Sequence, residues 1–580
     1  MVDYRKDSKN ILINCFFEDF FYLILLNLQF IIIQIIMKRL SNLLFLFLFA
    51  TNLLAQNKEI KNVILLIPDG TSLASVSTAR WFQRYMNPEM IRLNIDPYIC
   101  GTILTYCSNA PIGDSAPTTS CYMTGYPSLT GYVATYPVAD SLNDIVPMNP
   151  AKAYQPLMTL MEAARIAQNK STGLVFTCEF PHATPADCSA HSYKRDKYDW
   201  IAPQMVHNRL DVVIGGGVSI LTDDNKQFLR NEGYGLFLND IAGFRNYAGD
   251  KMWALFANTA MAYDIDRDPD KEPSLAEMTK TAIDKLSRNP NGFFLMVEGS
   301  KVDWAAHAND VRAIISDMLA FDKACGEAFK FAEKNRETLV VVVPDHGNSG
   351  ISIGSEKCPG YSTLTQDQLF GNIAKFKTSA DALVGILHNT KPAGLRQTFS
   401  DLTGISLTDD EYNQLLKTGD YKLSPLSNEE RMKGSKLTKE VATILNKYTC
   451  FGFTTTGHTG EEVFLAVYDP RPGKRLTGFH TNIELNHYLR KAMGLESRLE
   501  PLTDEYFAKH TDVFKGYSYV VGTVNNNPVL TVKNKKTILT VQPNTNIVKL
   551  NGKDIKLNSV IIYVDKNNTF YLPQSLRKLL

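Results

Sequence analysis

The sequence predicts an α/β fold with a largely parallel central sheet flanked by helices. The first observation is a series of short apolar runs, rich in Val, Ile, Leu and Phe, that have the composition of buried strands. The second is that helix-like stretches, such as residues 155–168 and 311–335, separate these runs. Strands that are apolar at successive positions are buried on both faces, and their alternation with helices is typical of parallel sheets. The runs are NVILLIP from Asn62, GLVF from Gly173, DVVIGGG from Asp211, GFFLMVEG from Gly292, TLVVVVPDHG from Thr338 and EEVFLAVYD from Glu461.

The length and composition of the chain indicate a large globular protein. At 580 residues the chain is too long for one small core, so we expect a large catalytic domain with accessory segments. Hydrophobic residues make up 44% and charged residues 21%, a composition that excludes wholesale disorder. The net charge of +1 gives no general attraction to nucleic acid, so we expect no specific nucleic-acid binding.

The N-terminal part is interpreted as an export signal preceded by extra sequence. MKRLSNLLFLFLFATNLLAQ, which begins at Met37, has a basic start, a short apolar run and the small residue Ala55 near its end. We therefore expect residues 37–55 to be a signal peptide, residues 1–36 to be an over-extended start, and the protein to be periplasmic or secreted. The alternative is a membrane anchor, because the apolar stretch before Met37 and the signal together are long enough to span a bilayer.

We expect a catalytic domain over residues 56–503 and a β-rich C-terminal module over residues 504–580. Within the first, residues 351–450 turn hydrophilic and helical and are interpreted as a crown-like insertion, which fits a solvated cover as well as a lid or an oligomer contact. The module alternates apolar and polar residues, with Asn-Gly and Asn-Asn turn signals, as antiparallel strands do. Its last residues faintly resemble stalk-like modules of secreted bacterial proteins, which leaves surface attachment open.

The nine cysteines form no CxxC pair, so their spacing predicts neither a zinc ribbon nor a thioredoxin-like motif. In an oxidising compartment, Cys178 and Cys188 are close enough in sequence to suggest a disulfide. The spacing does not fix the connectivity, and buried free thiols fit equally well.

Several of the predicted strands lead to an ionisable residue. Asp69 follows the first run, Glu298 ends the GFFLMVEG run, and Asp345 with His346 follow the TLVVVV run. In open parallel sheets, ligands bind beyond the carboxyl ends of the strands. The sequence therefore predicts that these side chains converge on one site.

Further candidate metal ligands occur at suggestive spacings. His182 and Thr184 alternate, so in an extended segment both would face the same way and suit one hard ion. Asp303 and His307 are four residues apart, so on a helix both project from one face and can hold one metal. His458, in the Gly/Thr-rich stretch TTTGHTGEE, is another candidate. Any one of these residues alone is explained as well by ordinary partial burial or capping.

The stretch PIGDSAPTTSCYMTGY, which begins at Pro111, raises the question of whether Ser115 is a nucleophile or part of a helix cap. Asp114 and Ser115 before small residues suit a helix N-terminus, whose backbone N–H groups favour an alkoxide or phosphate. The two interpretations therefore agree on the local structure. Because no lipase-like GxSxG elbow is present, activation of the hydroxyl by metal is favoured.

The order and spacing of these motifs resemble those of the alkaline phosphatase family. The motifs are LLIPDG, DSAPTTSCYMTG, HATPA followed by HSYKRD, DVVIGGG, VEGSKVDWAAH, PDHG and TTGHTGEE, and they span residues 61–470 without covering the C-terminal module. The resemblance implies hydrolysis of small-molecule phosphate monoesters to an alcohol and inorganic phosphate. It also implies a phosphoserine intermediate and a site with two Zn²⁺ and one Mg²⁺ per subunit. Family members are often dimers, which leaves a homodimer open.

The resemblance implies a role for each candidate residue. Ser115 would form the phosphoserine, and Arg195 would clamp the phosphate oxygens. The implied ligands are Asp69 between one zinc and the magnesium, Asp345 and His346 at the zinc that activates Ser115, Asp303, His307 and His458 at the other zinc, and His182, Thr184 and Glu298 around the magnesium. Trp304 stands where some relatives carry Lys or His, and His182 where some carry Asp. Turnover, magnesium affinity and pH dependence therefore do not transfer from any one relative.

Two other classes of function stay open. The first is a phosphodiesterase, nucleotide pyrophosphatase or sulfatase-like enzyme with the same metal core. Arg195 favours monoesters, unless it merely pairs with Asp196 at the surface, and DSAPTTS lacks the arginine of the sulfatase motif CxPxR. The second is a non-catalytic surface protein that keeps a metal-binding fold and attaches through its β-rich module.

Overall fold

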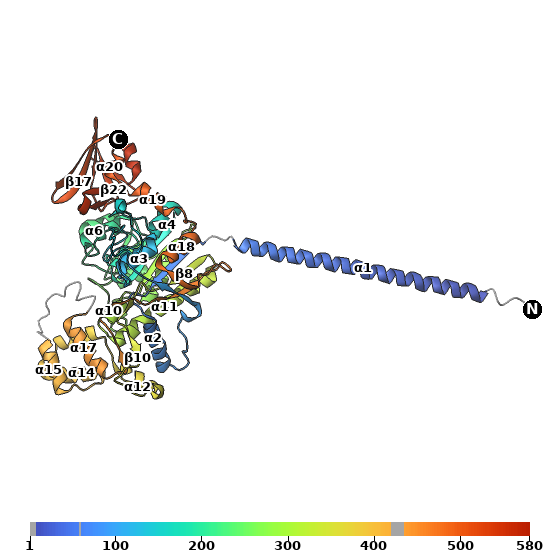
Figure 1. Ribbon diagram of the computed structural model, residues 1–580, viewed down its shortest axis with the longest axis horizontal. Coiled ribbons are helices and arrows are strands. Elements are labelled where there is room, and N and C mark those ends of the chain that lie inside the picture. The colour runs from blue at the N-terminus through green and yellow to red at the C-terminus, as the bar shows by residue number, and fades with distance from the viewer. Residues whose placement is uncertain (1–6, 57–59, 419–433) are drawn as a thin grey trace, which may run out of the picture. The chain divides into compact units, whose positions relative to one another are not determined.

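The computed structural model describes residues 7–56, 60–418 and 434–580, and it confirms an α/β fold built on a mostly parallel sheet (Figure 1). The central sheet has ten strands in the order β14-β2-β13-β8-β1-β7-β3-β4-β6-β5. Its neighbouring strands are parallel except at β13, which runs antiparallel to β2 and β8. The strands are β1 (Asn62–Ile67), β2 (Ile99–Leu104), β3 (Ser171–Glu179), β4 (Val212–Gly216), β5 (Gly235–Leu238), β6 (Met252–Leu255), β7 (Phe293–Glu298), β8 (Thr338–Val342), β13 (Val463–Tyr468) and β14 (Gly478–Thr481).

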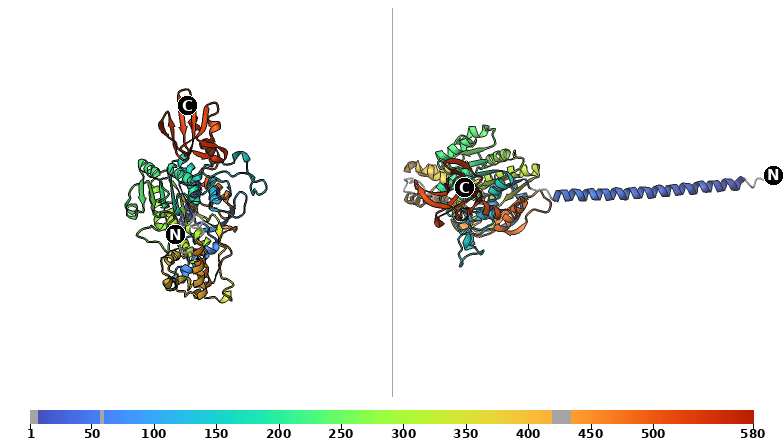
Figure 2. Two further views of the ribbon diagram at one scale, coloured as in Figure 1. Left: turned by 90° about the vertical axis from the view of Figure 1, so that its left-hand side faces the viewer. Right: turned by 90° about the horizontal axis from the view of Figure 1, so that it is seen from above.

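Both faces of the sheet are buried, as its continuous apolar strands predict. Along β1, Val63 and Leu65 pack into one hydrophobic cluster, whereas Ile64 and Leu66 pack into another on the opposite face. Helices cover both faces (Figure 2). They are α2 (Leu73–Met86), α3 (Ser115–Thr124), α4 (Leu160–Gln168), α5 (Ala183–Ala186), α6 (Tyr198–His207), α7 (Asp223–Asn231), α8 (Ile241–Asn246), α9 (Leu275–Leu286), α10 (Lys301–His307), α11 (Val311–Asn335), α18 (Asn482–Ala492) and α19 (Leu499–Tyr506).

The insertion predicted near residues 351–450 is mainly helical. Its elements are β10 (Ser352–Ile353), α12 (Gln366–Phe370), α13 (Ala380–His388), α14 (Leu395–Thr403), α15 (Asp409–Thr418), α17 (Lys436–Lys447) and β11 (Phe451–Gly452). A disulfide joins Cys358 to Cys450, which are 92 residues apart, and so ties the two ends of the insertion together.

The suggested disulfide between Cys178 and Cys188 is wrong, and the alternative of buried free thiols is correct for both. The Cys178 thiol donates to the Glu298 carboxylate, whereas the Cys188 thiol donates to the Thr184 carbonyl. The two sulfurs thus have different partners, although only ten positions separate them in the sequence.

The C-terminal segment forms the antiparallel strands that its alternation predicts. One sheet has the order β16-β17-β18-β19-β20, and a smaller one has the order β15-β22-β21. Their apolar faces share a separate core that includes Leu530, Val532 and Phe570. The elements are β15 (Ala508–Lys509), α20 (His510–Val513), β16 (Ser518–Val524), β17 (Asn527–Asn534), β18 (Thr537–Val541), β19 (Ile547–Leu550), β20 (Lys553–Lys556), β21 (Ile562–Val564) and β22 (Thr569–Leu572).

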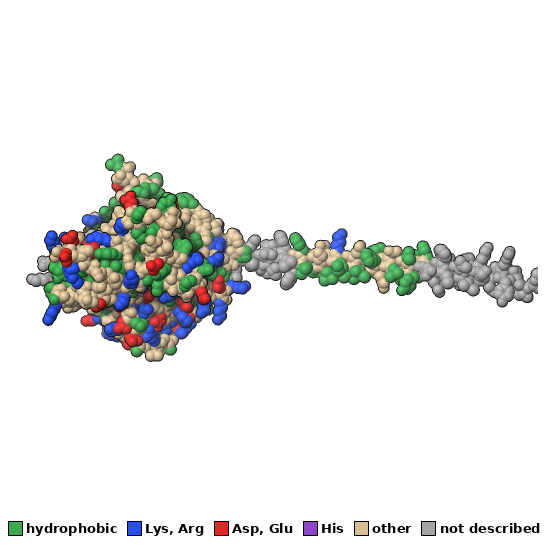
Figure 3. Space-filling view, turned by 90° about the horizontal axis from the view of Figure 1, so that it is seen from below, with side chains coloured by type: hydrophobic (Ala, Val, Ile, Leu, Met, Phe, Trp, Pro, Cys, Tyr) green, Lys and Arg blue, Asp and Glu red, His purple; other side chains and the backbone are tan. Residues whose placement is uncertain are grey.

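The N-terminal segment is one helix, α1 (Asp7–Gln56). Its stretch Phe20–Phe45 has the length and apolar composition of a membrane span, and its large apolar side chains are exposed on the helix surface (Figure 3). An exposed apolar helix near the N-terminus is consistent with a signal peptide and with a membrane anchor alike.

Candidate active site

Three neighbouring parallel strands bring their terminal acids together at one edge of the sheet. The order β8-β1-β7 places Asp345, Asp69 and Glu298 side by side, as the strand-end argument predicts. All three carboxyl groups are fully buried. Burial, followed by the negative charge of Asp345, raises the pKa of Asp69 and raises that of Glu298 to about 8.

Several oxygens of this acid cluster have no hydrogen-bond partner among the described residues. They are both carboxylate oxygens of Asp69, Oε1 of Glu298 and Oδ2 of Asp345. A buried carboxylate is costly unless it is paired, hydrogen-bonded or bound to a metal. Cations bound between these side chains would supply the missing partners, so the residues present fit a metal site.

The first group that can hold a metal ion consists of Asp69, Asp345 and His346. His346 Nε2 lies 3.5 Å from Asp69 Oδ1 and 3.5 Å from Asp345 Oδ2. The other Asp345 oxygen accepts hydrogen bonds from the backbone N–H groups of Gly70 and His346, which fixes the carboxylate. One histidine and two carboxylates form a donor set that zinc commonly takes.

The second group consists of Asp303, His307 and His458. Asp303 and His307 lie on one face of α10, as their spacing predicts, with His307 Nε2 3.4 Å from Asp303 Oδ2. His458, on the short strand β12 (His458–Thr459), brings its Nε2 to 3.1 Å from that of His307. Asn348 donates to Asp303 Oδ1 over 2.7 Å and holds the carboxylate in place.

The three histidines of these groups present the same ring nitrogen to the site. In each, Nδ1 lies against a backbone carbonyl, that of Thr456 for His307, Gly113 for His458 and Gly347 for His346. If Nδ1 carries the proton, Nε2 is left as a ligand atom, which is the usual arrangement of metal-binding histidines. Burial, followed by the charge of His346, lowers the pKa of His458 to about 3, so this ring is neutral and ready to bind.

The third group consists of Cys178, His182 and Glu298. Thr184 is fully buried close by in sequence, and its hydroxyl has no hydrogen-bond partner among the described residues. The prediction that His182 and Thr184 share an extended segment is wrong. His182 is the N-terminal flanking residue of α5, and Thr184 lies within that single turn, where Pro185 is easily accommodated.

Ser115 lies at the N-terminus of α3, as predicted. It is 3% exposed, and its Oγ is 3.3 Å from His346 Nε2, which places it beside the first metal-capable group. Asp114 occupies the N-cap position without accepting a capping hydrogen bond. Its carboxylate instead accepts hydrogen bonds from Arg195 and from the N–H of Gly131.

Arg195 reaches the same site from the loop before α6. Its Nη1 donates to Asp114 Oδ1 over 2.6 Å, and its Nη2 lies 3.0 Å from His182 Nε2. The interpretation of Arg195 as a surface partner of Asp196 is therefore not favoured, since its side chain is only 15% exposed and Asp196 lies 4.0 Å from Lys194. Burial, followed by the positive charge of Arg195, lowers the pKa of His182 to about 3.

A cleft of about 640 Å³ opens over these residues. Ser115, Arg195, His182, Asp303, His307 and His458 line it together with Ile112, Thr455 and Thr456. Lys439 of α17 also lines the cleft, so the insertion contributes a cation to the wall of the site. The cleft is wide enough for a small phosphorylated molecule.

Sequence reasoning missed three residues of this site. Cys178 was considered only for a disulfide, because on a strand buried on both faces a cysteine resembles any other apolar residue and gives no sign of a metal ligand. Asp114 was interpreted as a cap. Lys439 stands in a hydrophilic helix where a charge is ordinary.

Trp304 is 3% exposed, and its ring meets that of His182 edge to face, with 5.9 Å between the ring centroids.

Comparisons with known proteins agree with this geometry. A family model described as "Alkaline phosphatase" matches residues 60–495. Alkaline phosphatase 3 of Bacillus subtilis (strain 168) is 31% identical over 451 residues, which cover 75% of this chain and 89% of the relative. The crystal structure of the cold-active alkaline phosphatase from Shewanella sp. aligns with a TM-score of 0.62 and 26% identity. The alignment covers 74% of this chain and 99% of that one. The Thermus thermophilus enzyme, at 22% identity, 76% and 92% coverage and a TM-score of 0.64, supports the fold.

Proposed function

This chain belongs to the alkaline phosphatase family of phosphomonoester hydrolases, and we propose that it acts through a phosphoserine on Ser115 at a site for two Zn²⁺ and one Mg²⁺. The observation that carries the proposal is that candidate metal ligands from two groups lie around one hydroxyl, that of Ser115. Ser115 Oγ, at a helix N-terminus, lies beside His346 in a cleft that Asp303, His307 and His458 also line.

The metal assignment follows from the donor atoms. Asp69, Asp345 and His346 would hold one zinc, and Asp303, His307 and His458 the other. His182, Thr184 and Glu298 would surround the magnesium, with Asp69 shared between the first zinc and the magnesium. When bound, zinc ions stabilise negative charge on the attacking and leaving oxygens of a phosphoryl transfer.

In the first half of the reaction, Ser115 Oγ forms a bond to phosphorus while the bond from phosphorus to the alcohol oxygen breaks. The hydroxyl proton lost by Ser115 is balanced by the proton that the departing alcohol takes up. The N–H groups at the start of α3 point toward this position and favour a dianionic phosphate there.

In the second half, a water molecule from the cleft attacks the phosphoserine. The bond between phosphorus and Ser115 Oγ breaks, the serine regains a proton, and inorganic phosphate leaves. Arg195 offers a planar fork that matches two phosphate oxygens. Its ion pair with Asp114 holds the guanidinium within the cleft, at the cost of engaging Nη1.

The experiment that tests this function is the release of p-nitrophenol from its phosphate monoester at alkaline pH with Zn²⁺ and Mg²⁺ present. The native enzyme is compared with Ser115→Ala and with the control Ser219→Ala, whose exposed hydroxyl bonds to the Asn258 carbonyl and does not line the cleft. We expect chelator-sensitive hydrolysis that falls by about 10³-fold or more in Ser115→Ala and is unchanged in Ser219→Ala.

An enzyme that is folded and zinc-loaded but releases no phosphate from monoesters would contradict the proposal. The same preparations are therefore tested with bis(p-nitrophenyl) phosphate, since faster cleavage of this diester would indicate a phosphodiesterase. Metal binding without either activity would indicate a non-catalytic surface protein.

For export, residues 37–55 are proposed to act as a signal peptide cleaved after Ala55, which would leave a periplasmic or secreted enzyme made of the catalytic domain (56–503) and the C-terminal module. N-terminal sequencing of the exported protein should then begin at Gln56. Recovery of uncleaved protein from the membrane fraction would favour the anchor instead.

Dimerisation and surface attachment through residues 504–580 are tested on the same material by light scattering and cell fractionation.

A further inference from the structure

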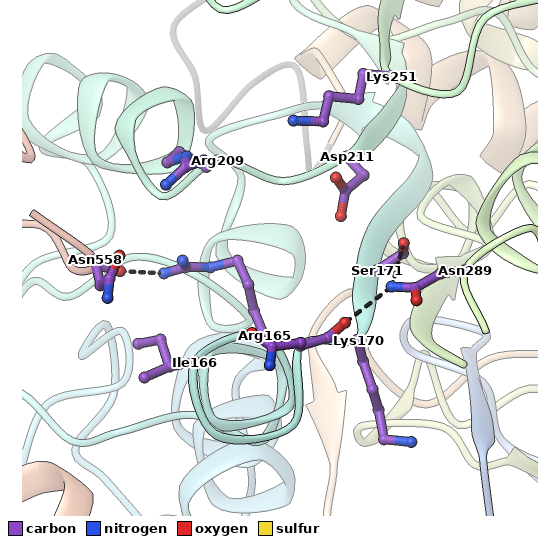
Figure 4. Close-up of a pocket in the computed structure, with 10 residues that line it drawn as sticks. Arg165, Ile166, Lys170, Ser171, Arg209, Asp211, Lys251, Asn289 and Asn558 are labelled. Atoms are coloured by element: carbon purple, nitrogen blue, oxygen red, sulfur yellow. Dashed lines mark hydrogen bonds between the residues drawn. The ribbon is translucent and has the colours of Figure 1, made fainter. Parts of the chain in front are cut away.

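The amino ends of the central strands carry a second, separate hollow. Residues at or just before the starts of β3, β4 and β6, namely Ser171, Asp211 and Lys251, line a cavity of about 250 Å³ (Figure 4). Because the strands are parallel, this cavity opens at the edge opposite the one where Asp69 and Glu298 lie. None of its lining residues is a candidate for the catalytic site.

Positive charge is in excess in this hollow. Arg165, Arg209 and Lys251 line it, against the single carboxylate of Asp211. Among the salt bridges of the described residues, none involves any of these three cations. Asp211 already accepts a hydrogen bond from the backbone N–H of Thr172 through Oδ2, over 2.9 Å. Lys170 is left out of this count, because its ammonium donates to the carbonyls of Lys61 and Asn291 and points away from the other cations in Figure 4.

The Arg165 guanidinium is held in place by neutral groups. Its Nη2 donates to Asn208 Oδ1 over 2.8 Å and to the Asn558 carbonyl over 2.6 Å. Burial lowers the pKa of Arg165, and the nearby negative charges of Glu162 and Asp211 only partly oppose this shift, so its charged form is destabilised where it stands. A cation fixed by neutral acceptors, beside two further cations, is an arrangement that an anion would stabilise.

We propose that this hollow, here called the basic pocket and defined by Arg165, Arg209, Lys251 and Asp211, binds a small tetrahedral oxyanion of the phosphate class. Two guanidinium groups and one ammonium are the donors that recognise phosphate oxygens. The volume is below that of pockets for drug-sized ligands, which favours free phosphate or one phosphate group. The inference does not rest on the proposed catalytic function, since it uses no catalytic residue.

Occupancy of the basic pocket has a structural consequence. Asn558 belongs to the C-terminal module, and its carbonyl is the group that the Arg165 guanidinium bonds. An anion that fixes Arg165 also fixes this contact between the module and helix α4. We therefore expect phosphate to stabilise the packing of the module on the catalytic domain.

The test is equilibrium dialysis of inorganic phosphate against the metal-loaded, full-length enzyme in detergent, at constant ionic strength set with chloride. The native enzyme should bind two phosphates per chain, one at the catalytic site and one in the basic pocket. The double variant Arg209→Gln/Lys251→Gln should bind the second phosphate at least about tenfold more weakly and keep the first. Hydrolysis of p-nitrophenyl phosphate should be unchanged, which keeps this outcome distinct from failure of the catalytic proposal.

Two further variants make the result decisive. Asp211→Asn keeps an oxygen that can accept from Thr172 but removes the only carboxylate, so the second phosphate should bind several-fold more tightly, a change that damage to the fold would not produce. The control Lys226→Gln/Arg230→Gln removes two cations of α7 that do not line the basic pocket, and it should change nothing. One phosphate per native chain, or equal second-site affinity in the native enzyme and Arg209→Gln/Lys251→Gln, would overturn the proposal. If sulfate binds the basic pocket as tightly as phosphate does, the pocket accepts any tetrahedral oxyanion, which also supports the proposal.

Discussion

The carboxyl and amino ends of the central strands carry opposite charges, and they differ in how completely those charges are buried. At the carboxyl ends, Asp69, Glu298 and Asp345 are fully buried and crowd one another. At the amino ends, Arg165, Arg209 and Lys251 are only half-buried around a small hollow. Charge interactions strengthen as water is excluded. Changes at the carboxyl ends should therefore have large effects, and changes to half-buried charges should have small ones.

Among the metal-site side chains, we expect the largest effect of a single change in the group formed by Asp303, His307 and His458. His307→Ala removes one of three donors, so zinc at this group should be lost and kcat/KM should fall by at least about 10²-fold. Metal analysis of the dialysed protein and steady-state kinetics measure both quantities. The control His480→Ala changes a partly exposed histidine beside Glu484, outside the three metal-capable groups, and should retain full metal content. Full zinc content in His307→Ala would contradict the expectation that changes near the carboxyl ends of the strands have the large effects.

The next effect concerns Arg195. Arg195→Lys keeps the charge but loses the planar fork, so kcat/KM for a monoester should fall by about 10–10²-fold. Because the arginine also pairs with Asp114, the matched variant Asp114→Asn should lower kcat/KM less. A lysine variant as active as the native enzyme would show that a point charge suffices.

Metal removal should make stability depend on pH. In the metal-free protein, burial and Asp345 raise the pKa of Glu298 from 4.5 to about 8. Between these values the folded state binds more protons than the unfolded state, so the free energy of unfolding should fall as pH rises from about 4.5 to about 8, and then level off. Thermal unfolding of the chelated protein across this range measures the trend.

Two comparisons sharpen the pH experiment. Glu298→Gln should make the slope shallower in the metal-free protein, because one titrating group is gone while Asp69, whose pKa is also raised, still contributes. Adding Zn²⁺ and Mg²⁺ should remove the slope in the native enzyme, since the bound cations favour the ionised carboxylate. Metal-free protein that gains stability toward pH 8 would contradict the account of this acid cluster.

The smallest expected effect is at Lys439, on the wall of the catalytic cleft. Partly exposed cations interact weakly through water, so Lys439→Met should raise KM only about two- to fivefold. We expect this change only for monoesters that carry a further negatively charged group besides the phosphate that is cleaved. p-Nitrophenyl phosphate, whose leaving group carries no charge, serves as the reference, and Lys436→Met, on the same helix, as the matched variant. Equal changes in KM for both substrates would argue against a charge interaction.

The sequence was sufficient to predict six of the ten strands of the central sheet, namely β1, β3, β4, β7, β8 and β13, whereas β2, β5, β6 and β14 were not predicted. Continuous apolar runs have few structural solutions, and the i, i+4 spacing of Asp303 and His307 needs only a helix to bring them together. The spacing argument for His182 and Thr184 failed, because alternation in period two predicts a shared face only if the segment is extended, whereas Ala183–Ala186 is a helical turn.

Features made by distant residues could not be predicted in this way. The disulfide joins Cys358 to Cys450 across 92 positions, and no local pattern marks the pair. Cys178 meets Glu298 only because β3 and β7 are neighbours. The basic pocket combines Arg165, Arg209, Asp211 and Lys251, each an ordinary polar residue in its own segment. The roles of the catalytic and metal-binding candidates themselves stay predictions.

The most direct test of the central claim is to trap the covalent intermediate. Metal-loaded enzyme is mixed with excess inorganic phosphate, quenched at low pH where the phosphoserine bond survives, digested, and mapped by mass spectrometry. The account predicts an added phosphoryl group on Ser115 within the peptide that contains DSAPTTS, and none there in Ser115→Ala. An active enzyme whose phosphoryl group appears on another residue, or on none, would contradict it.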